Sequence, residues 1–255
     1  MSALHLVRHG NVAELRLDNP SKLNAFTLEM LEAVEPHCVE IERDDGIRAV
    51  VVSAEDSRAF CAGADILAWS ELAPREFARN WVRYGHRIFD RLARLAKPTI
   101  TAMNGHAFGG GLEFAGATDL RIMSPGTTLA LPEAAVGIVP GWSGTQRLIR
   151  LLGEPLVKEM ALFGRRISAE RAHAAGFAAE IVEDPRARAF EIAEEQATRS
   201  SCAIEVAKYM IHAAVEEDRG AMIEALGAGM IGPTKDREEG VTAFREKRKP
   251  NFPGK

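Results

Sequence analysis

Two amphipathic helices, each followed at once by a short apolar strand, constrain the fold of this chain most. In residues 28–41 the apolar side chains recur three and four positions apart, and an apolar strand pattern follows at residues 47–53. The same order repeats at residues 77–95, where a Lys-Pro pair ends the helix before an apolar strand at residues 99–103. Helices that alternate with short buried strands predict an α/β fold.

Strand patterning also precedes the first helix. Residues 13–17 alternate between apolar and charged side chains, after a turn at residues 9–11. Thr27 is a suitable N-cap for the helix that begins after it. We expect Pro36 to remove one backbone hydrogen bond from that helix and to bend it.

The last third of the chain carries helical patterns only. Strand patterning ends near residue 182, and the helical segments beyond it are residues 186–200, 203–215, 221–226 and 237–247. We therefore predict an α/β core at residues 1–182 and a helical C-terminal extension at residues 183–255.

Length, charge and cysteine content argue against several classes of protein. A chain of 255 residues with 46% hydrophobic and 27% charged residues has the composition of an ordinary globular protein. Its formal net charge of −4 gives no general attraction to nucleic acid or to an anionic membrane. The three cysteines have no metal-ligand spacing, and the N-terminus lacks the apolar core of a signal peptide. We therefore expect a cytoplasmic protein with no metal site, no nucleic-acid partner and no membrane partner.

A glycine-rich turn at residues 104–113 joins the second strand to a further helix. Gly109, Gly110 and Gly111 allow bare backbone to approach a ligand closely. The first amides of the helix have no intrahelical partner and carry partial positive charge, so the turn can stabilise an anion. It lacks the Gly-x-Gly-x-x-Gly spacing of dinucleotide-binding proteins and the Lys-Ser/Thr pair of a P-loop.

Three acidic residues near expected helix starts each have a structural explanation when considered singly. Glu113 lies in the first turn of the helix after the glycines, and Glu133 follows Pro132, a common first residue of a helix. Asp65 follows a loop of small residues and can cap the next helix. One at a time, these residues indicate helix starts more readily than a catalytic site.

Together with their neighbours, these stretches resemble the enoyl-CoA hydratase/isomerase family, also called the crotonase family. Residues 59–66 (AFCAGADI) resemble the family's coenzyme A-binding loop, and residues 97–113 (KPTITAMNGHAFGGGLE) resemble its central signature. Residues 131–134 (LPEA), 137–141 (GIVPG) and 144–148 (GTQRL) match the motif that follows, and residues 243–252 (AFREKRKPNF) are similar to the family's C-terminal end. The resemblance implies a crotonase-like spiral of β-β-α units, with a helical extension that packs the protein into a homotrimer or homohexamer.

The resemblance also implies a reaction and its residues. The backbone N–H groups of Ala64 and Gly110 would form an oxyanion hole for the thioester oxygen of an acyl-CoA. Glu113 and Glu133 fall on both acid/base positions of the hydratases, which add water across the 2,3 double bond of a 2-enoyl-CoA. We expect a short or medium acyl chain, a place in fatty acid metabolism, and no cofactor, because coenzyme A is part of the substrate.

Two segments are expected to hold the coenzyme A portion. Residues 22–25 match the family segment that passes near the adenine, and residues 65–67 follow the oxyanion residue Ala64. The expected binding residues are Lys22, Leu23, Ala25, Asp65, Ile66 and Leu67. The basic run at residues 247–249 is expected either to face the phosphates of coenzyme A or to remain a solvated tail.

The chain departs from the family pattern at two places. Trp142 stands where many members carry a small residue, and its ring either lines the acyl pocket or points away from it. Residues 227–233 are glycine-rich where members carry bulkier residues near the adenine, which argues against a side-chain contact to coenzyme A from that segment.

Two other functions are open at this point. An enoyl-CoA isomerase moves a double bond with one main carboxylate, and the presence of both Glu113 and Glu133 favours hydration instead. A non-catalytic or RNA-binding member of the same fold would call for a basic surface, which the net charge of −4 does not support.

Overall fold

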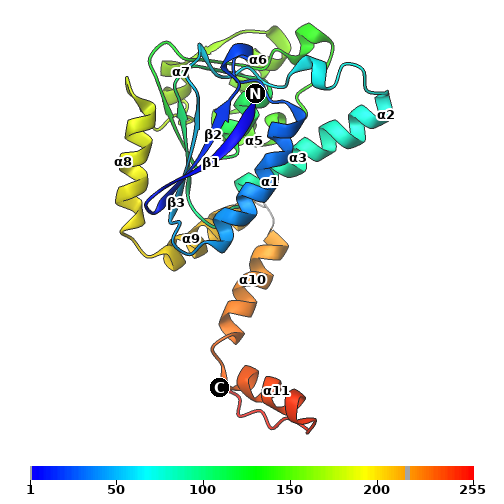
Figure 1. Ribbon diagram of the computed structural model, residues 1–255, viewed down its shortest axis with the longest axis vertical. Coiled ribbons are helices and arrows are strands. Elements are labelled where there is room, and N and C mark those ends of the chain that lie inside the picture. The colour runs from blue at the N-terminus through cyan, green and yellow to red at the C-terminus, as the bar shows by residue number, and fades with distance from the viewer. Residues whose placement is uncertain (1, 216–218) are drawn as a thin grey trace. The chain divides into compact units, whose positions relative to one another are not determined.

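The computed structural model describes residues 2–215 and 219–255, in two compact units, Met1–Ser201 and Cys202–Lys255 (Figure 1). Every strand of the described residues lies in the first unit, and the second unit is helical. No helix in the described ranges is long and apolar enough to cross a membrane.

The first unit contains two sheets. The larger sheet has the order β1-β2-β3-β5-β7-β10 and is parallel except for β1, which pairs antiparallel with β2. The smaller sheet has the order β4-β6-β8-β9 and is parallel except for the pair β8 and β9. The strands are β1 (Ala3–His9), β2 (Val12–Asp18), β3 (Ala49–Ala54), β4 (Ala59–Cys61), β5 (Thr99–Met103), β6 (His106–Phe108), β7 (Leu120–Met123), β8 (Thr128–Ala130), β9 (Ile167–Ser168) and β10 (Glu180–Ile181).

Helices connect successive turns of this strand arrangement. The α-helices of the first unit are α1 (Leu28–Arg43), α2 (Pro74–Glu76), α3 (Arg83–Ala93), α4 (Gly110–Gly116), α5 (Gly144–Leu152), α6 (Glu154–Phe163), α7 (Ala169–Ala174) and α8 (Pro185–Ala197). Short 3-10 segments are η1 (Pro20–Lys22), η2 (Ile66–Ala68) and η4 (Glu133–Val136), and a π-helical segment, η3 (Phe77–Val82), runs directly into α3.

Each turn of the chain places one strand in each sheet. The consecutive pairs β3 and β4, β5 and β6, and β7 and β8 put their first strand in the larger sheet and their second in the smaller one. The helices α3, α4 and α5 follow these pairs in order. This is the spiral of β-β-α units expected from the sequence, and it brings the loops after β4, β6 and β8 to one place.

The expected amphipathic face of α1 lies in the core. Its buried residues are Met30, Leu31, Val34, Cys38 and Ile41. The Thr27 side chain accepts a hydrogen bond from Met30 N, as expected of an N-cap. The helix continues through Pro36, because burial of apolar side chains on both sides of the proline offsets the lost backbone bond.

The helix α8 packs against the larger sheet. Its Ala189 and Ala193 are fully buried in a cluster with apolar residues of β2, β3, β5 and β7. At its start, Arg186 Nε donates to the buried carboxylate of Glu14 on β2 at 2.7 Å. The first compact unit therefore extends to Ser201, and the predicted boundary at residue 182 lies one helix too early, because helical periodicity does not indicate which surface a helix covers.

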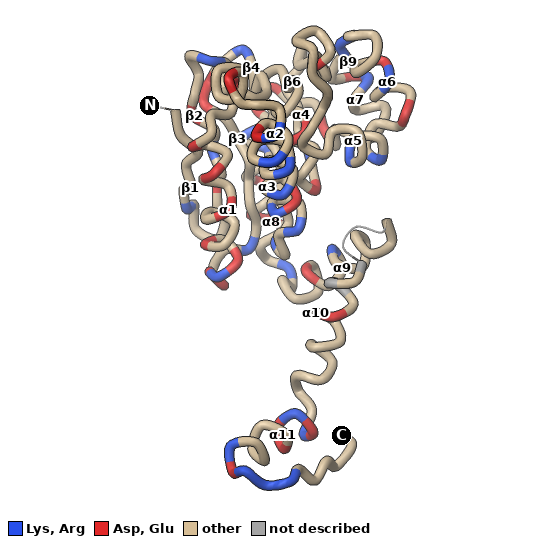
Figure 2. The backbone as a smooth tube through the Cα atoms, turned by 90° about the vertical axis from the view of Figure 1, so that its right-hand side faces the viewer, with Lys and Arg blue, Asp and Glu red and all other residues tan. Residues whose placement is uncertain are grey.

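The described residues of the second unit form helices. They are α9 (Ser201–Ala214), α10 (Arg219–Ile231) and α11 (Lys235–Glu246). The expected helices at 203–215, 221–226 and 237–247 fall within or next to these bounds, except that α10 continues through the glycine-rich stretch to Ile231. Figure 2 shows the basic run after α11, in which Arg248 is paired with Glu239 at 2.6 Å.

Candidate active site

The glycine-rich turn closes tightly between β6 and α4. Gly109 has φ +49° and ψ −126°, which lies in a region that glycine adopts far more readily than other residues. A Cβ atom on Gly111 would lie 2.2 Å from the carbonyl oxygen of Cys61, so the start of α4 packs directly on the end of β4. Gly110 is the first residue of α4, and its N–H has no partner within the helix.

The loop after β4 presents a second free amide beside the first. Phe26 N donates to Gly63 O and Asp65 N donates to Phe26 O, both at 2.8 Å. This parallel bridge between Phe26 and Ala64 turns the N–H of Ala64 away from Phe26. A Cβ atom on Gly110 would lie 3.6 Å from Ala64 N. The two amides expected to form an oxyanion hole are therefore neighbours.

Glu113 lies one turn into α4 and is 3% exposed. Its Oε1 accepts hydrogen bonds from Trp142 N at 2.8 Å and from Gly144 N at 2.7 Å. Both amides reach one oxygen because Ser143, between them, adopts a left-handed conformation with φ +81°. These contacts hold one carboxyl oxygen of Glu113 in place and leave the other for chemistry.

Glu133 begins η4 immediately after Pro132 and is 8% exposed. Its Oε1 would lie 2.9 Å from a Cβ atom on Gly109, so the carboxylate lies against the backbone of the glycine-rich turn. Its Oε2 is buried and has no hydrogen-bond partner among the described residues. An unpaired buried carboxyl oxygen is costly, and in this position it faces a cavity.

Burial raises the pKa of both carboxyl groups to about 7. For Glu113, the nearby Glu133 carboxylate raises the pKa further, while the amides of Trp142 and Gly144 lower it. Two such groups beside one cavity favour a state in which the pair carries a single proton near neutral pH. Such a state places one carboxylic acid and one carboxylate beside the same cavity.

The two amides and the two carboxylates line one cavity of about 200 Å³. Most of the remaining wall is apolar, as expected of a pocket for an acyl chain. The lining residues outside the predicted set are Ala62, Gly63, Trp69, Phe77, Trp81, Val82, Gly109, Pro132, Ala135, Val136, Ile138, Val139, Gly141 and Trp142. The position of Trp142, which the sequence left open, is therefore on the pocket wall.

The predicted coenzyme A segments lie next to this cavity. Ala62 N donates to Leu23 O at 3.0 Å, and Lys22 Nζ donates to the Asp65 carboxylate at 2.5 Å. Ile66 lines the cavity and is 47% exposed, whereas Leu67 is 77% exposed. Ala25 is buried directly after the turn at Leu23 and Asn24. The structure thus joins residues 22–25 to residues 62–67 at the mouth of the site.

Several functional features were not predicted from the sequence. The amide pair of Trp142 and Gly144 that holds Glu113 depends on the left-handed Ser143, a conformation that serine adopts rarely. The aromatic residues Trp69 and Trp81 line the pocket, although the spacing of Trp81 indicated only the apolar face of a helix and Trp69 belonged to no predicted element. The sequence feature that could have indicated this role is the concentration of aromatic residues between Trp69 and Phe89.

A β-β-α spiral with two convergent amides and two buried carboxylates defines an enzyme of the crotonase class. The family model for enoyl-CoA hydratase/isomerase matches residues 8–255. The chain is 34% identical to the short-chain-enoyl-CoA hydratase of Clostridium acetobutylicum, over 96% of this chain and 95% of that protein. It is 32% identical to the crotonyl-CoA hydratase of Syntrophomonas wolfei, over 97% of this chain and 96% of that protein.

Solved structures agree with this assignment. The crystal structure of enoyl-CoA hydratase from Bacillus anthracis is similar with a TM-score of 0.80 at 32% identity, over 99% of both chains. The chain therefore belongs to the enoyl-CoA hydratase/isomerase family, and the family and the fold expected from the sequence are confirmed.

Proposed function

We propose that this protein is an enoyl-CoA hydratase that adds water across the 2,3 double bond of a 2-enoyl-CoA. The observation that carries the proposal is the position of Glu113 and Glu133 on one cavity, beside the amides of Ala64 and Gly110. The hydratase names of the Clostridium and Syntrophomonas relatives support the same reaction.

The amides act on the thioester oxygen. When water attacks C3, the electron pair of the double bond moves toward the thioester carbonyl and an enolate-like state develops. The N–H groups of Ala64 and Gly110 donate to this oxygen as its charge grows, and one such donor is typically worth about 3 kcal/mol. Gly110 contributes in addition the partial positive charge of the α4 N-terminus.

The carboxyl groups move the protons. The carboxylate of the pair accepts a proton from water as the oxygen–C3 bond forms, and the carboxylic acid delivers its proton to C2. One proton enters the pair and one leaves it, so the pair returns to its starting charge. The raised pKa values support this single-proton state, and the bonds from Trp142 N and Gly144 N orient Glu113 for the transfer.

The substrate's coenzyme A portion lies along the mouth of the site. Lys22, Leu23 and Ala25 approach it from one side, and Asp65, Ile66 and Leu67 approach it from the other. The joined backbone of these two segments supports this placement. The reaction uses no cofactor beyond the substrate itself, and acyl-CoA is the only small-molecule partner that we propose.

The assembly is a homotrimer or a homohexamer, built through the helices of residues 202–255. Large apolar side chains on these helices support an assembly role, because isolated proteins rarely expose so many. They include Met210, Ile211, Ile223, Met230, Ile231 and Phe244. We place the protein in the cytoplasm and its reaction in fatty acid metabolism.

Paired variants test the hydratase against the isomerase alternative. Glu113→Gln and Glu133→Gln should each reduce hydration of crotonyl-CoA by roughly 10² to 10⁴-fold, while both still bind butyryl-CoA, because the amides of Ala64 and Gly110 remain. An isomerase would lose turnover of a 3-enoyl-CoA in Glu133→Gln and keep it in Glu113→Gln. Hydration that survives in either variant would contradict the acid/base roles.

A further inference from the structure

The cavity has an open end and a closed end. Ile66 and Val136 are about half exposed, and Val139 is 77% exposed, so these residues border the mouth. Trp81 and Trp142 also line the cavity but are only 4% and 3% exposed. Their ring centroids lie 5.2 Å apart. The two indoles therefore close the cavity at its inner end.

Trp142 lies beside the reacting part of the site. A Cβ atom on Gly110 would lie 2.7 Å from Cζ3 of the Trp142 ring, and the same Cβ would lie 3.6 Å from Ala64 N. The ring edge is therefore next to both amides of the oxyanion hole. An acyl chain that leaves the thioester toward the inner end meets this indole within a few bonds.

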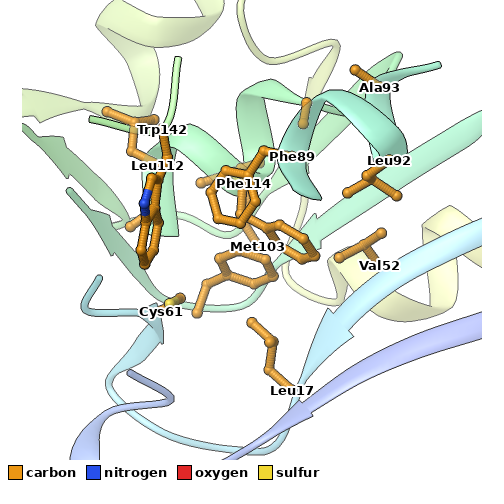
Figure 3. Close-up of a cluster of buried hydrophobic side chains, with 14 of the residues drawn as sticks. Leu17, Val52, Cys61, Phe89, Leu92, Ala93, Met103, Leu112, Phe114 and Trp142 are labelled. Carbon is orange, nitrogen blue, oxygen red and sulfur yellow. The ribbon is translucent and has the colours of Figure 1, made fainter. Parts of the chain in front are cut away.

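The core behind Trp142 prevents the ring from moving back. A Cβ atom on Gly85 of α3 would lie 2.2 Å from the indole nitrogen, so glycine at this position leaves only the space that the ring fills. The Phe89 ring lies 5.1 Å away and Phe26 lies 6.3 Å away, and both are fully buried. Figure 3 draws the indole among the buried side chains that also include Phe89 and Phe114. Close-packed cores do not yield to a longer ligand without strain.

A hydrogen bond fixes the orientation of the ring as well. Trp142 Nε1 donates to the backbone carbonyl of Trp81 at 3.3 Å. Trp81 belongs to the π-helical segment Phe77–Val82, in which the backbone hydrogen bonds are displaced from the α-helical pattern. Rotation of the indole out of the pocket would leave the buried indole N–H without this partner.

We infer that Trp142 ends the acyl pocket and restricts this enzyme to short 2-enoyl-CoA substrates. This inference rests on the proposed hydratase function. The Trp142 ring edge lies beside the two amides expected to bind the thioester oxygen, so only a short space of the cavity separates the thioester from the indole wall. Crotonyl-CoA fits this space, and longer chains encounter the two indoles.

A series of trans-2-enoyl-CoA substrates with four, six, eight and ten acyl carbons tests the inference in the full-length protein. The value of kcat/KM should be highest for the four-carbon chain. It should fall at least about tenfold by the eight-carbon chain, because one misfitting methylene in an apolar pocket changes kcat/KM by about 10 to 200-fold. A ten-carbon chain that is hydrated as efficiently as crotonyl-CoA would overturn the inference, since the chain would then leave past Val139.

Variants of Trp142 locate the cause of the preference. Trp142→Ala and the milder Trp142→Phe remove ring volume but keep the backbone N–H that donates to Glu113. The ratio of kcat/KM for the ten-carbon over the four-carbon substrate should rise at least about tenfold in Trp142→Ala, and by less in Trp142→Phe. Phe177→Leu is the matched control, because it shortens a fully buried core side chain that does not line the cavity, and it should leave the ratio unchanged.

The outcomes separate this inference from the proposed function. If the parent protein hydrates crotonyl-CoA but has the same chain-length ratio of kcat/KM as its Trp142 variants, the proposed hydratase function stands and the inference about Trp142 is wrong. If the parent protein hydrates no 2-enoyl-CoA of any chain length, the proposed hydratase function itself is wrong. If Trp142→Ala does not fold, Trp142→Phe and the relative affinities of butyryl-CoA and decanoyl-CoA for the parent decide the result.

Discussion

Glu113→Gln should stabilise the protein at alkaline pH although it removes a proposed acid/base group. The Glu113 carboxyl group is 3% exposed and its pKa is raised to about 7, because burial and the neighbouring Glu133 disfavour its charged form. A glutamine keeps the oxygen that accepts from Trp142 N and Gly144 N. The substitution therefore removes the ionisation and preserves the contacts.

The magnitude follows from the pKa difference. A pKa raised from 4.5 to about 7 corresponds to about 3 kcal/mol between the two protonation states. The folded protein binds this proton more tightly than the unfolded chain. The resulting stability is fully present below about pH 4.5 and is lost as the pH rises through 7. The glutamine variant does not undergo this loss, so it should exceed the parent by only about 1 kcal/mol at pH 5 and by about 3 kcal/mol at pH 8.

Urea unfolding at a fixed protein concentration, repeated from pH 5 to pH 8, measures this difference. Glu14→Gln serves as a control of opposite sign. Burial alone would raise the pKa of Glu14, but the hydrogen bonds from Arg186, Ser53 and His9 lower it to about 2, so this variant should be less stable than the parent at neutral pH. Equal stability of Glu113→Gln and the parent at pH 8, with the expected loss in Glu14→Gln, would refute the reasoning.

Four further results are expected. The kcat/KM for crotonyl-CoA should fall on both sides of neutral pH, because only the singly protonated carboxyl pair reacts and both pKa values are about 7; a flat profile from pH 5 to 9 would contradict this. Gly111→Ala should abolish hydration and lower the Tm, because its Cβ would lie 2.2 Å from Cys61 O, whereas Gly220→Ala, with open space around it, should change neither. Dialysis against a strong chelator should leave hydration intact, and a loss restored by added metal would disprove the cofactor-free reaction. Light scattering should give three or six times the chain mass of 27.8 kDa, and a monomer at micromolar concentration would be inconsistent with the proposed assembly.

The parts of the fold that could be predicted are those with long periodic patterns. Residues 28–41 and 77–95 read as amphipathic helices because each carries several turns of apolar periodicity. The strands β4, β6 and β8 span three residues each, too few for a pattern, so the second sheet could not be seen in the sequence. The helix α8 was predicted from the sequence, but its packing against the larger sheet was not. Its buried Ala189 and Ala193 are small and give the helix little amphipathic contrast.

The residues of the site could be predicted from short motifs, but their geometry could not. Glu113 and Glu133 belong to different elements, and only the spiral brings them to one cavity. The environment of Glu113 depends on Ser143, whose left-handed backbone has no signal in its side chain. Trp142 could be noticed as unusual, but its orientation is decided by the space left at Gly85 and by the carbonyl of Trp81.

Backbone strain is concentrated around the same site. The described non-glycine residues with positive φ are Leu23, Asn24, Ser143 and Lys247, and the first three border the cavity or the segment joined to it. Such conformations cost of order 1 to 3 kcal/mol each and persist only where the surroundings hold them. The Asn24 side chain donates to Glu55 O and Ala59 O and accepts from Asn19 N, and Ser143 Oγ lies 3.1 Å from His86 Nδ1.

These contacts explain why an unfavourable arrangement survives folding. The strained loops aim amides at Glu113 and at the oxyanion position, and the buried carboxyl pair is destabilising in its ionised form. Both costs fall on the residues that the proposed reaction needs, and the apolar core around Phe26, Phe89 and Phe114 offsets them. A site built in this way should gain stability from substitutions that destroy its chemistry, since the strain and the buried charge have no role in folding. The stability of Glu113→Gln relative to the parent at pH 8 therefore measures the cost of burying the ionised Glu113 carboxylate.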